Sequence, residues 1–255
     1  MNIHSGSRGD LERSRHPRPA RPDRRRDRAN GGLGLETGRQ LAAKGAHVVM
    51  AVRNQKKAAA AVDEIRTSVS LTALLLPALL RTPGARIVTV TSTAHHMGRA
   101  INPANPHLHG RYRPWRAYGQ AKLANFHFGL GLQRELENAD ATTASLIAHP
   151  GLSNTDLQAV SVQQTGGGMS QQFFLFLARR SGMSAADGAL SQLRAATDPA
   201  AKGGEFYGPR FVNSGPPVRK PVVRRLGMDK AIAALWEVSE RETGIAIDVH
   251  AAAAA

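Results

Sequence analysis

Tyr118 and Lys122 are the residues whose types and spacing most suggest chemistry. They stand four positions apart in "WRAYGQAKLANFHFGLGLQRELENA", a segment with the length and composition of a long helix. Residues four apart on a helix project from one face, about a turn apart. An ammonium group beside a phenol favours the phenolate form. The pair could therefore exchange a proton with a substrate, although a partly exposed helix face gives the same spacing by chance.

A serine and a turn at the ends of two predicted strands extend this pattern. Ser92 ends "ARIVTVTS" (85–92), whose β-branched residues predict a strand. Open α/β sheets place their chemistry at the carboxyl ends of strands, although a lone serine there more simply starts a turn. In "HPGLSNT", Pro150 and Gly151 would turn the backbone close to a ligand, and Thr155 could donate a hydroxyl hydrogen bond. Together these features predict one site at a sheet edge.

The elements that must position this site alternate between helix and strand, which is typical of an α/β fold with a parallel sheet. Helices are predicted at 32–45, 56–66, 71–80, 115–139, 184–197 and 229–244, and strands at 46–52, 85–92, 142–149 and 203–209. Helices 56–66 and 71–80 follow each other with no strand between them. This break in the alternation indicates that part of a regular sheet is missing.

Five segments carry a resemblance to a known family: "ANGGLGLETGRQLAAKGAHVVMAVRN", "VTVTSTAHHMGR", "AYGQAKLAN", "HPGLSNTDL" and "LWEVSERETG". Together they resemble the short-chain dehydrogenase/reductases, most of all the bacterial retinol-dehydrogenase-like branch. The resemblance implies a Rossmann-like doubly wound parallel sheet and hydride transfer between a nicotinamide ring and an alcohol or carbonyl carbon. It implies that Tyr118 is the general acid/base. It also implies that Lys122 supports the phenolate and holds the nicotinamide ribose, while Ser92 hydrogen-bonds the substrate oxygen.

The same resemblance implies the cofactor contacts. The phosphate-binding turn would contain Asn30, Gly32, Leu33 and Gly34, and the nicotinamide would lie near Pro150, Gly151 and Thr155 as well as Tyr118 and Lys122. At the end of the strand predicted at 46–52, "AVRN" offers Arg53 where an acidic residue would favour NAD. A guanidinium group suits a 2'-phosphate, so NADP is preferred over NAD. Arg53 could also simply end a strand on the surface.

The chain departs from the family pattern at two places. "RRRDRANGGLG" (24–34) has an arginine run where an apolar strand should enter the turn. Between residues 66 and 71, roughly 60 residues are missing at about 30 for each strand-helix unit, including the family's catalytic asparagine. The Rossmann-like sheet is therefore predicted to be incomplete, without its first, third and fourth strands and with exposed strand edges.

The domain organisation follows from these boundaries. Residues 1–28, with nine Arg and four acidic residues, are expected to be a basic, disordered tail. Residues 29–249 are expected to form one incomplete dehydrogenase domain, and 250–255 an alanine tail. The Arg and Pro bias of the first segment is also typical of a GC-rich coding strand read out of frame. The chain is therefore interpreted as a shifted or truncated reading of an oxidoreductase gene.

Composition narrows the remaining classes of function. The sequence contains no cysteine, which excludes thiolate catalysis. The longest apolar run, 71–80, is too short to span a membrane, and no secretory signal is recognised, so a cytoplasmic location is expected. His95 and His96 are adjacent, and no metal is predicted. The net charge of +15 leaves nucleic-acid binding through the tail as an alternative, although no specific nucleic acid is expected.

The apolar segment "FFLFL" (173–177) lies where the similar family has a substrate lid. It suggests a small apolar alcohol, aldehyde or ketone as substrate, retinol-like or otherwise lipid-like, although a core helix or a membrane-surface contact would give the same composition. A homo-oligomer is possible. The main alternative to an enzyme is a catalytically inactive, dehydrogenase-like binding or scaffold protein.

Overall fold

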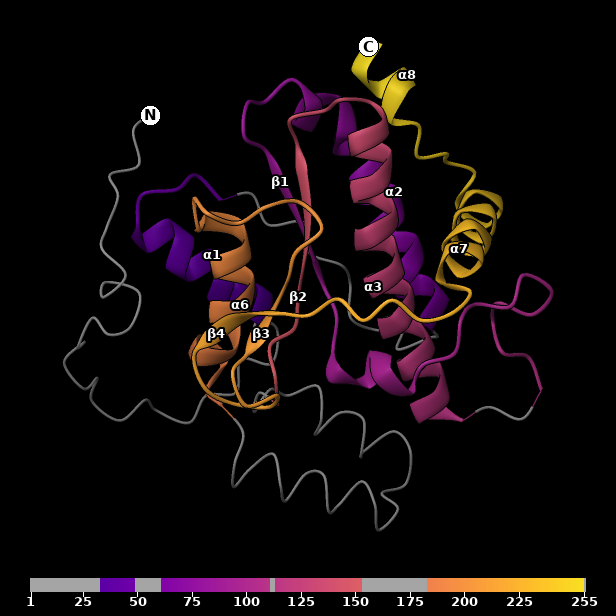
Figure 1. Ribbon diagram of the computed structural model, residues 1–255, viewed down its shortest axis with the longest axis horizontal. Helices are drawn as coiled ribbons and strands as arrows, with labels where there is room; N and C mark the ends of the chain where they lie inside the picture. Colours follow the sequence, from indigo (N-terminus) through magenta and orange to yellow (C-terminus); the bar gives the residue numbers. More distant parts are fainter. Residues whose placement is uncertain (1–32, 49–60, 111–112, 153–182, 255) are drawn as a thin grey trace, which may run out of the picture. The chain divides into compact units, whose positions relative to one another are not determined.

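The sheet is the centre of the fold. The computed structural model describes residues 33–48, 61–110, 113–152 and 183–254 (Figure 1). Within them, four strands lie in the order β1 (Arg86–Val90), β2 (Ala144–Ala148), β3 (Phe206–Pro209) and β4 (Pro217–Lys220). The first three strands are parallel and β4 is antiparallel to β3. The predicted α/β fold with a mostly parallel, Rossmann-like sheet is confirmed.

Three of the four strands coincide with predicted ones, and β4 was missed. The segment "RFVNSGP" between β3 and β4 is a tight connection in which Arg210 N–H donates to the Pro216 carbonyl at 2.9 Å and Phe211 N–H to that of Ser214 at 3.0 Å. β4 begins at a proline, which is tolerated because this strand lies at the sheet edge. Its short and polar sequence carries no strand pattern, so only its pairing with β3 defines it.

The side chains of β2 alternate between two faces of the sheet, as a strand requires. Leu146 and Ala148 are fully buried on the side where Ala195 belongs to the same apolar cluster. Ile147 points the other way and packs with Phe126 and Phe206. Figure 1 shows the sheet between α6 (Ala185–Thr197) and α3 (Pro114–Asn138). Burial on both faces explains why β2 reads as a continuous apolar run.

The longer helices follow the predictions except at 61–80, and two short helical elements, at 93–97 and 249–254, were not predicted. The remaining helical elements are α1 (Leu33–Ala43), α2 (Ala61–Leu80), the 3-10 helix η1 (Thr93–Met97), α7 (Met228–Thr243) and α8 (Val249–Ala254). The sequence predicts separate helices at 56–66 and 71–80, and this is wrong for the described residues, where α2 is continuous from Ala61 to Leu80 and includes residues 67–70. Val69 and Leu76, two turns apart and each 1% exposed, bury one face of this continuous helix.

The largest apolar cluster lies among the helices. It includes Leu132 and Leu136 of α3 and Leu235 of α7, together with Val249 at the start of α8. Residues 250–254, assigned from the sequence to a tail, are helical. On the outer side of α2, Leu71, Leu74 and Leu75 are exposed. The homo-oligomer stays a prediction that this exposed stripe makes testable.

The strand predicted at 46–52 is not seen in the part of the chain that the structure describes. Residues 46–48 are not a strand, and the rest of 46–52 lies outside the described ranges. Within those ranges β1 pairs only with β2 and forms one edge of the sheet. The predicted segments 1–28 and 173–177 also lie outside the described residues.

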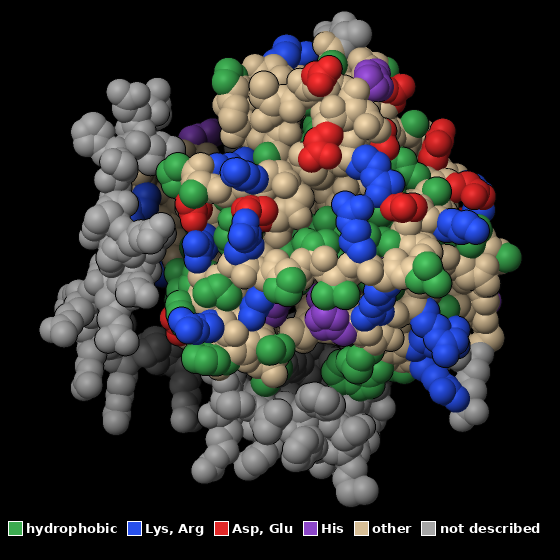
Figure 2. All heavy atoms as spheres, in the orientation of Figure 1, with side chains coloured by type: hydrophobic (Ala, Val, Ile, Leu, Met, Phe, Trp, Pro, Cys, Tyr) green, Lys and Arg blue, Asp and Glu red, His purple; other side chains and the backbone are tan. Residues whose placement is uncertain are grey.

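Figure 2 shows basic side chains interspersed with acidic ones on the drawn face, rather than gathered into one stripe. In a search of the described residues, none of the helices has both the length and the apolar character needed to cross a bilayer.

Candidate active site

Helix α3 carries the Tyr118 and Lys122 pair. The helix begins at Pro114, whose fixed φ suits the first helical position. Both side chains are partly buried, and Lys122 Nζ lies 5.5 Å from the centre of the Tyr118 ring. An ammonium group at this distance from an aromatic face is attracted to it. The structure therefore brings the two groups together as their spacing suggests.

Two buried hydrogen bonds fix the first half of α3 to the carboxyl end of β1. Thr91 Oγ1 donates to the Lys122 carbonyl at 2.6 Å, and Asn125 Nδ2 donates to the Val90 carbonyl at 3.0 Å. Thr91 is 2% exposed and Asn125 4%. Buried polar side chains in native structures are hydrogen-bonded, and here the two bonds also join the helix to the end of the strand. Sequence reasoning missed both residues, although Thr91 adjoins Ser92 and Asn125 is one turn beyond Lys122.

Ser92 begins η1 directly after this anchored strand end. Its backbone is extended, with φ −145° and ψ 160°, and its Oγ accepts the Ala94 N–H at 3.3 Å. Ser92 therefore has the turn-starting role that the sequence left open. This bond uses Oγ only as an acceptor, so within the described residues the hydroxyl hydrogen is left to donate to a ligand oxygen.

The segment after Ser92 docks against α3 at two glycines. A Cβ atom on Gly119 would lie 3.3 Å from the backbone of Gly98, and one on Gly98 would lie 2.7 Å from Leu123 Cβ and closer still to the Gly119 carbonyl. Only glycine allows so close an approach of backbone to backbone. Because Gly119 follows Tyr118, this contact holds the chain that Ser92 starts beside the helix that carries Tyr118.

Three buried histidines lie behind this surface. His95 Nδ1 donates to the Ser92 carbonyl at 2.6 Å, and its ring stacks on Phe126 with centroids 4.6 Å apart. Burial lowers the pKa of His95 to about 4, although the bond to Ser92 acts in the opposite direction. Burial also lowers the pKa of His127 and of His149 to about 4. In the described ranges, no three His, Asp or Glu side chains are placed to hold a metal.

The predicted nicotinamide-side residues are described in part. Pro150 and Gly151 follow β2, and Gly151 has a φ of +72°, a conformation that favours glycine. The Gly151 N–H donates to His149 Nδ1 at 3.2 Å. Thr155 lies outside the described residues.

The phosphate-side residues are less completely described. Asn30, Gly32 and Arg53 lie outside the described residues, while Leu33 and Gly34 form the start of α1. This helix packs against α6: Gln192 Nε2 donates to Thr37 Oγ1 at 3.0 Å, and Gln40 Nε2 donates to the Ala186 carbonyl at 3.3 Å. Among the described residues, a Cβ on Gly34 would meet nothing within 4 Å, so the described part of the chain leaves the helix start open on that side.

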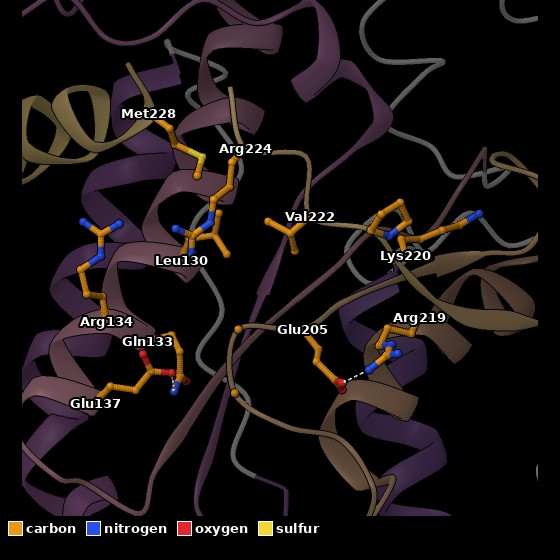
Figure 3. Close-up of a pocket in the computed structure, with 13 residues that line it drawn as sticks. Leu130, Gln133, Arg134, Glu137, Glu205, Arg219, Lys220, Val222, Arg224 and Met228 are labelled. Atoms are coloured by element: carbon orange, nitrogen blue, oxygen red, sulfur yellow. Dashed lines mark hydrogen bonds and ion pairs between the residues drawn. The ribbon is translucent and has the colours of Figure 1, made fainter. Parts of the chain in front are cut away.

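A cavity of about 640 Å³ lies elsewhere, along the second half of α3 (Figure 3). None of the predicted site residues lines it. Gln133, one of its lining residues, is about 22 Å from Tyr118 along the helix axis at 1.5 Å per residue. Its acidic groups have partners in the described chain: Glu205 pairs with Arg219 at 2.8 Å, and Glu137 accepts from Gln133 at 2.9 Å. The cavity is therefore separate from the Tyr118 and Lys122 surface.

Comparison with known proteins adds evidence of descent. No protein-family model matches the chain. A polyprenol dehydrogenase from Mus musculus is 44% identical over 93 residues, which are 34% of this chain and 27% of that protein. Retinol dehydrogenase 11 from Homo sapiens is 41% identical over 87 residues, 34% of this chain and 26% of that one. The chain thus spans about a quarter of the length of these curated relatives.

A crystal structure of an uncharacterized protein from Mycobacterium paratuberculosis is also similar. It is 36% identical, with a TM-score of 0.53, over 71% of this chain and 57% of the other. The mostly parallel sheet, the helix bearing Tyr118 and Lys122, and these relatives together support the short-chain dehydrogenase/reductase family. The curated relatives named as polyprenol and retinol dehydrogenases support its retinol-dehydrogenase-like branch.

Proposed function

We propose that this chain is an oxidoreductase that transfers a hydride between NADP(H) and the alcohol or carbonyl carbon of a small apolar molecule. The observation that supports this most is the docking of the Ser92 segment on α3 beside Tyr118, with Lys122 Nζ 5.5 Å from the Tyr118 ring centre. The apolar substrate is inferred from relatives named as retinol and polyprenol dehydrogenases.

Each side chain has a chemical role in this proposal. In reduction, the Tyr118 hydroxyl donates its proton to the substrate oxygen, and in oxidation the phenolate takes that proton back. The Ser92 hydroxyl donates a hydrogen bond to the same oxygen, where negative charge develops. The Lys122 ammonium stabilises the phenolate and holds the nicotinamide ribose. A bound nicotinamide supplies or accepts the hydride.

The described residues fit a nicotinamide nucleotide at two points. Gly151, at φ +72°, allows the backbone after β2 to approach a ligand closely. The open start of α1 at Gly34 leaves backbone N–H groups for a phosphate. The proposed cofactor contacts also include Asn30, Gly32, Leu33, Pro150 and Thr155.

The preference for NADP over NAD rests on Arg53 in the sequence. Replacing Arg53 by glutamate would remove the positive charge and place a carboxylate near the 2'-phosphate. We expect the ratio of kcat/KM for NADPH to that for NADH to fall by at least about tenfold, since one lost charge-assisted hydrogen bond is worth about 1.5–3 kcal/mol. An unchanged ratio would show that Arg53 does not select the cofactor.

The proposed chemistry is tested by Tyr118→Phe. Purified protein is incubated with NADPH and retinal, or with NADP and retinol, and absorbance at the NADPH band is followed. Loss of a general acid/base should lower kcat by about 10²- to 10⁴-fold. Tyr207→Phe is the matched control, because it removes a hydroxyl that bonds Glu205 at 2.6 Å and does not belong to the proposed site. It should leave kcat nearly unchanged.

The alternative of an inactive binding or scaffold protein predicts a different result. That protein would unfold cooperatively and show no nucleotide-dependent turnover on a panel of aldehydes and ketones. Equal turnover by wild type and Tyr118→Phe would reject the proposed role of Tyr118.

A further inference from the structure

The turn that follows β2 is held by the side chain that precedes it. His149 is 3% exposed, and its Nδ1 accepts the N–H of Gly151, two residues further on, at 3.2 Å. Asn and Asp side chains form the same bond to the second following N–H when they start a turn. An imidazole in this position can therefore set the conformation of residues 149–151.

The β3–β4 hairpin contacts both the His149 imidazole and the turn that follows β2. The His149 N–H donates to the Tyr207 carbonyl at 2.9 Å, and a Cβ on the next residue, Gly208, would collide with the imidazole ring. A Cβ on Gly151 would lie 2.6 Å from the Asn213 carbonyl oxygen and 2.7 Å from Pro209 Cγ. Glycines at 208 and 151 thus make room for the ring and the turn, respectively.

One more hydrogen bond joins the residue after the turn to the connection between β3 and β4. The Leu152 N–H donates to the Asn213 carbonyl at 3.0 Å, so the hairpin connection is bonded to the residue after the turn. The His149 ring also packs against Phe206, with centroids 5.3 Å apart. The turn is therefore held on one side by the imidazole and on the other by the hairpin connection.

We propose that His149 is a positioning residue: by accepting the Gly151 N–H, its Nδ1 fixes the Pro150–Gly151 turn against the β3–β4 hairpin and aims the turn's backbone at a bound nicotinamide. The role of His149 in the turn depends only on the geometry described above. The part that concerns the nicotinamide rests on the proposed function.

The bond requires a neutral imidazole. Burial and the positive charges that His95, Lys220 and His96 can carry lower the pKa of His149 to about 4. At neutral pH the ring is therefore uncharged, Nδ1 is the acceptor and the proton lies on Nε2.

Two variants separate the acceptor from the bulk of the side chain. His149→Asn keeps an oxygen that can accept the Gly151 N–H, and His149→Leu fills the buried space without an acceptor. His127→Asn is the control, because it truncates a histidine that is also buried but lies on α3. The first measurement is amide hydrogen exchange of Gly151 by NMR in the full chain without ligand. The second is the Kd for NADP with the KM and kcat of turnover.

We expect Gly151 exchange to be about tenfold faster in His149→Leu than in wild type, since a net hydrogen bond of about 1–1.5 kcal/mol corresponds to roughly that factor. Exchange in His149→Asn and His127→Asn should stay within about threefold of wild type. In His149→Leu, the Kd and KM for NADP should rise about tenfold and kcat should change less, with recovery in His149→Asn.

The outcomes are distinguishable. Unchanged Gly151 exchange in His149→Leu would overturn the positioning role whatever the activity. Faster exchange with unchanged NADP affinity would overturn its link to the nicotinamide. If wild-type protein binds neither NADP nor NAD, the proposed function and that link fail together, while the exchange measurement still decides the role of His149 in the turn.

Discussion

Two regions of this molecule resemble motifs of the same family, but different contacts hold each of them in place. At the carboxyl end of β1, Thr91 and Asn125 tie strand and helix together through buried hydrogen bonds. At the start of the domain, α1 is bonded to α6 through Gln40 and Gln192. The first region thus has a parallel strand pair beneath it, whereas the described contacts of α1 are with another helix.

The difference shows which contacts hold a site in place in this fold. The Tyr118 surface is held by a hydrogen bond from Asn125 to the Val90 carbonyl of a paired strand and by one from Thr91, next to that strand, to the Lys122 carbonyl of α3. The position of a strand is fixed by its ladder. The α1 contact joins two helices through side-chain amides, and Gln192 Oε1 is buried without a hydrogen-bond partner among the described residues. The region around Tyr118 is therefore expected to be more rigid and to contribute more to stability than α1.

Lowering the pH should destabilise the region around Tyr118 more than α1, and this is the largest of the expected effects. His95, His127 and His149 are held neutral with pKa values of about 4, against 6.5 when exposed. Between pH 6.5 and 4 the unfolded chain binds more protons than the folded one, so stability falls as pH falls through this window. Each histidine accounts for at most on the order of 3 kcal/mol.

Urea unfolding at pH 7, 6, 5 and 4 measures this loss. His127→Gln should flatten the dependence between pH 6.5 and 4. A free energy of unfolding that is constant across this range would show that these histidines are not buried neutral in solution.

Truncating the core beneath α3 should come next in size. Leu132 is fully buried, so Leu132→Ala should lower the free energy of unfolding by about 2–5 kcal/mol. Leu41 on α1 is only partly buried, and Leu41→Ala should cost about 1 kcal/mol or less. Chemical denaturation of both variants gives the comparison, and equal losses would contradict the asymmetry between the two regions.

Removing one strand-to-helix bond should have a smaller effect. Thr91→Val keeps the shape of the side chain but leaves the Lys122 carbonyl without its 2.6 Å bond, at a cost of about 1–3 kcal/mol. Because this bond positions the helix, kcat should also fall several-fold. Thr82→Val is the control, since Thr82 Oγ1 bonds the Ala78 carbonyl in an exposed position. If both variants behave alike in stability and kcat, Thr91 does not position α3.

The α1 contact should give the smallest change. Gln192→Leu removes the bond to Thr37 and also removes the unpartnered oxygen, so the two effects largely cancel. We expect the free energy of unfolding to change by less than about 0.5 kcal/mol, with faster hydrogen exchange confined to α1. A loss above about 2 kcal/mol would show that α1 is held as firmly as α3.

Much of the fold follows from local pattern. The β-branched run ending at Ser92, the apolar run of β2 and the periodicity of α3, α6 and α7 were sufficient to predict those elements. The prediction failed where the local signal was weak or misleading. β4 has no apolar alternation and is defined by its pairing with β3. Helix α2 continues across residues 67–70, where Val69 shares a buried face with Leu76.

The site divides in the same way. The sequence by itself determined that Tyr118 and Lys122 share a helix face and that Ser92 ends a strand, because these relations depend on residues near each other in the chain. Only the tertiary structure decided what holds them in place. These contacts are the bonds of Thr91 and Asn125, the approach of Gly98 to Gly119, and the bond of His149 to Gly151 against the β3–β4 hairpin. These contacts join segments that are distant in sequence, and no local pattern encodes which distant backbone a buried side chain will meet.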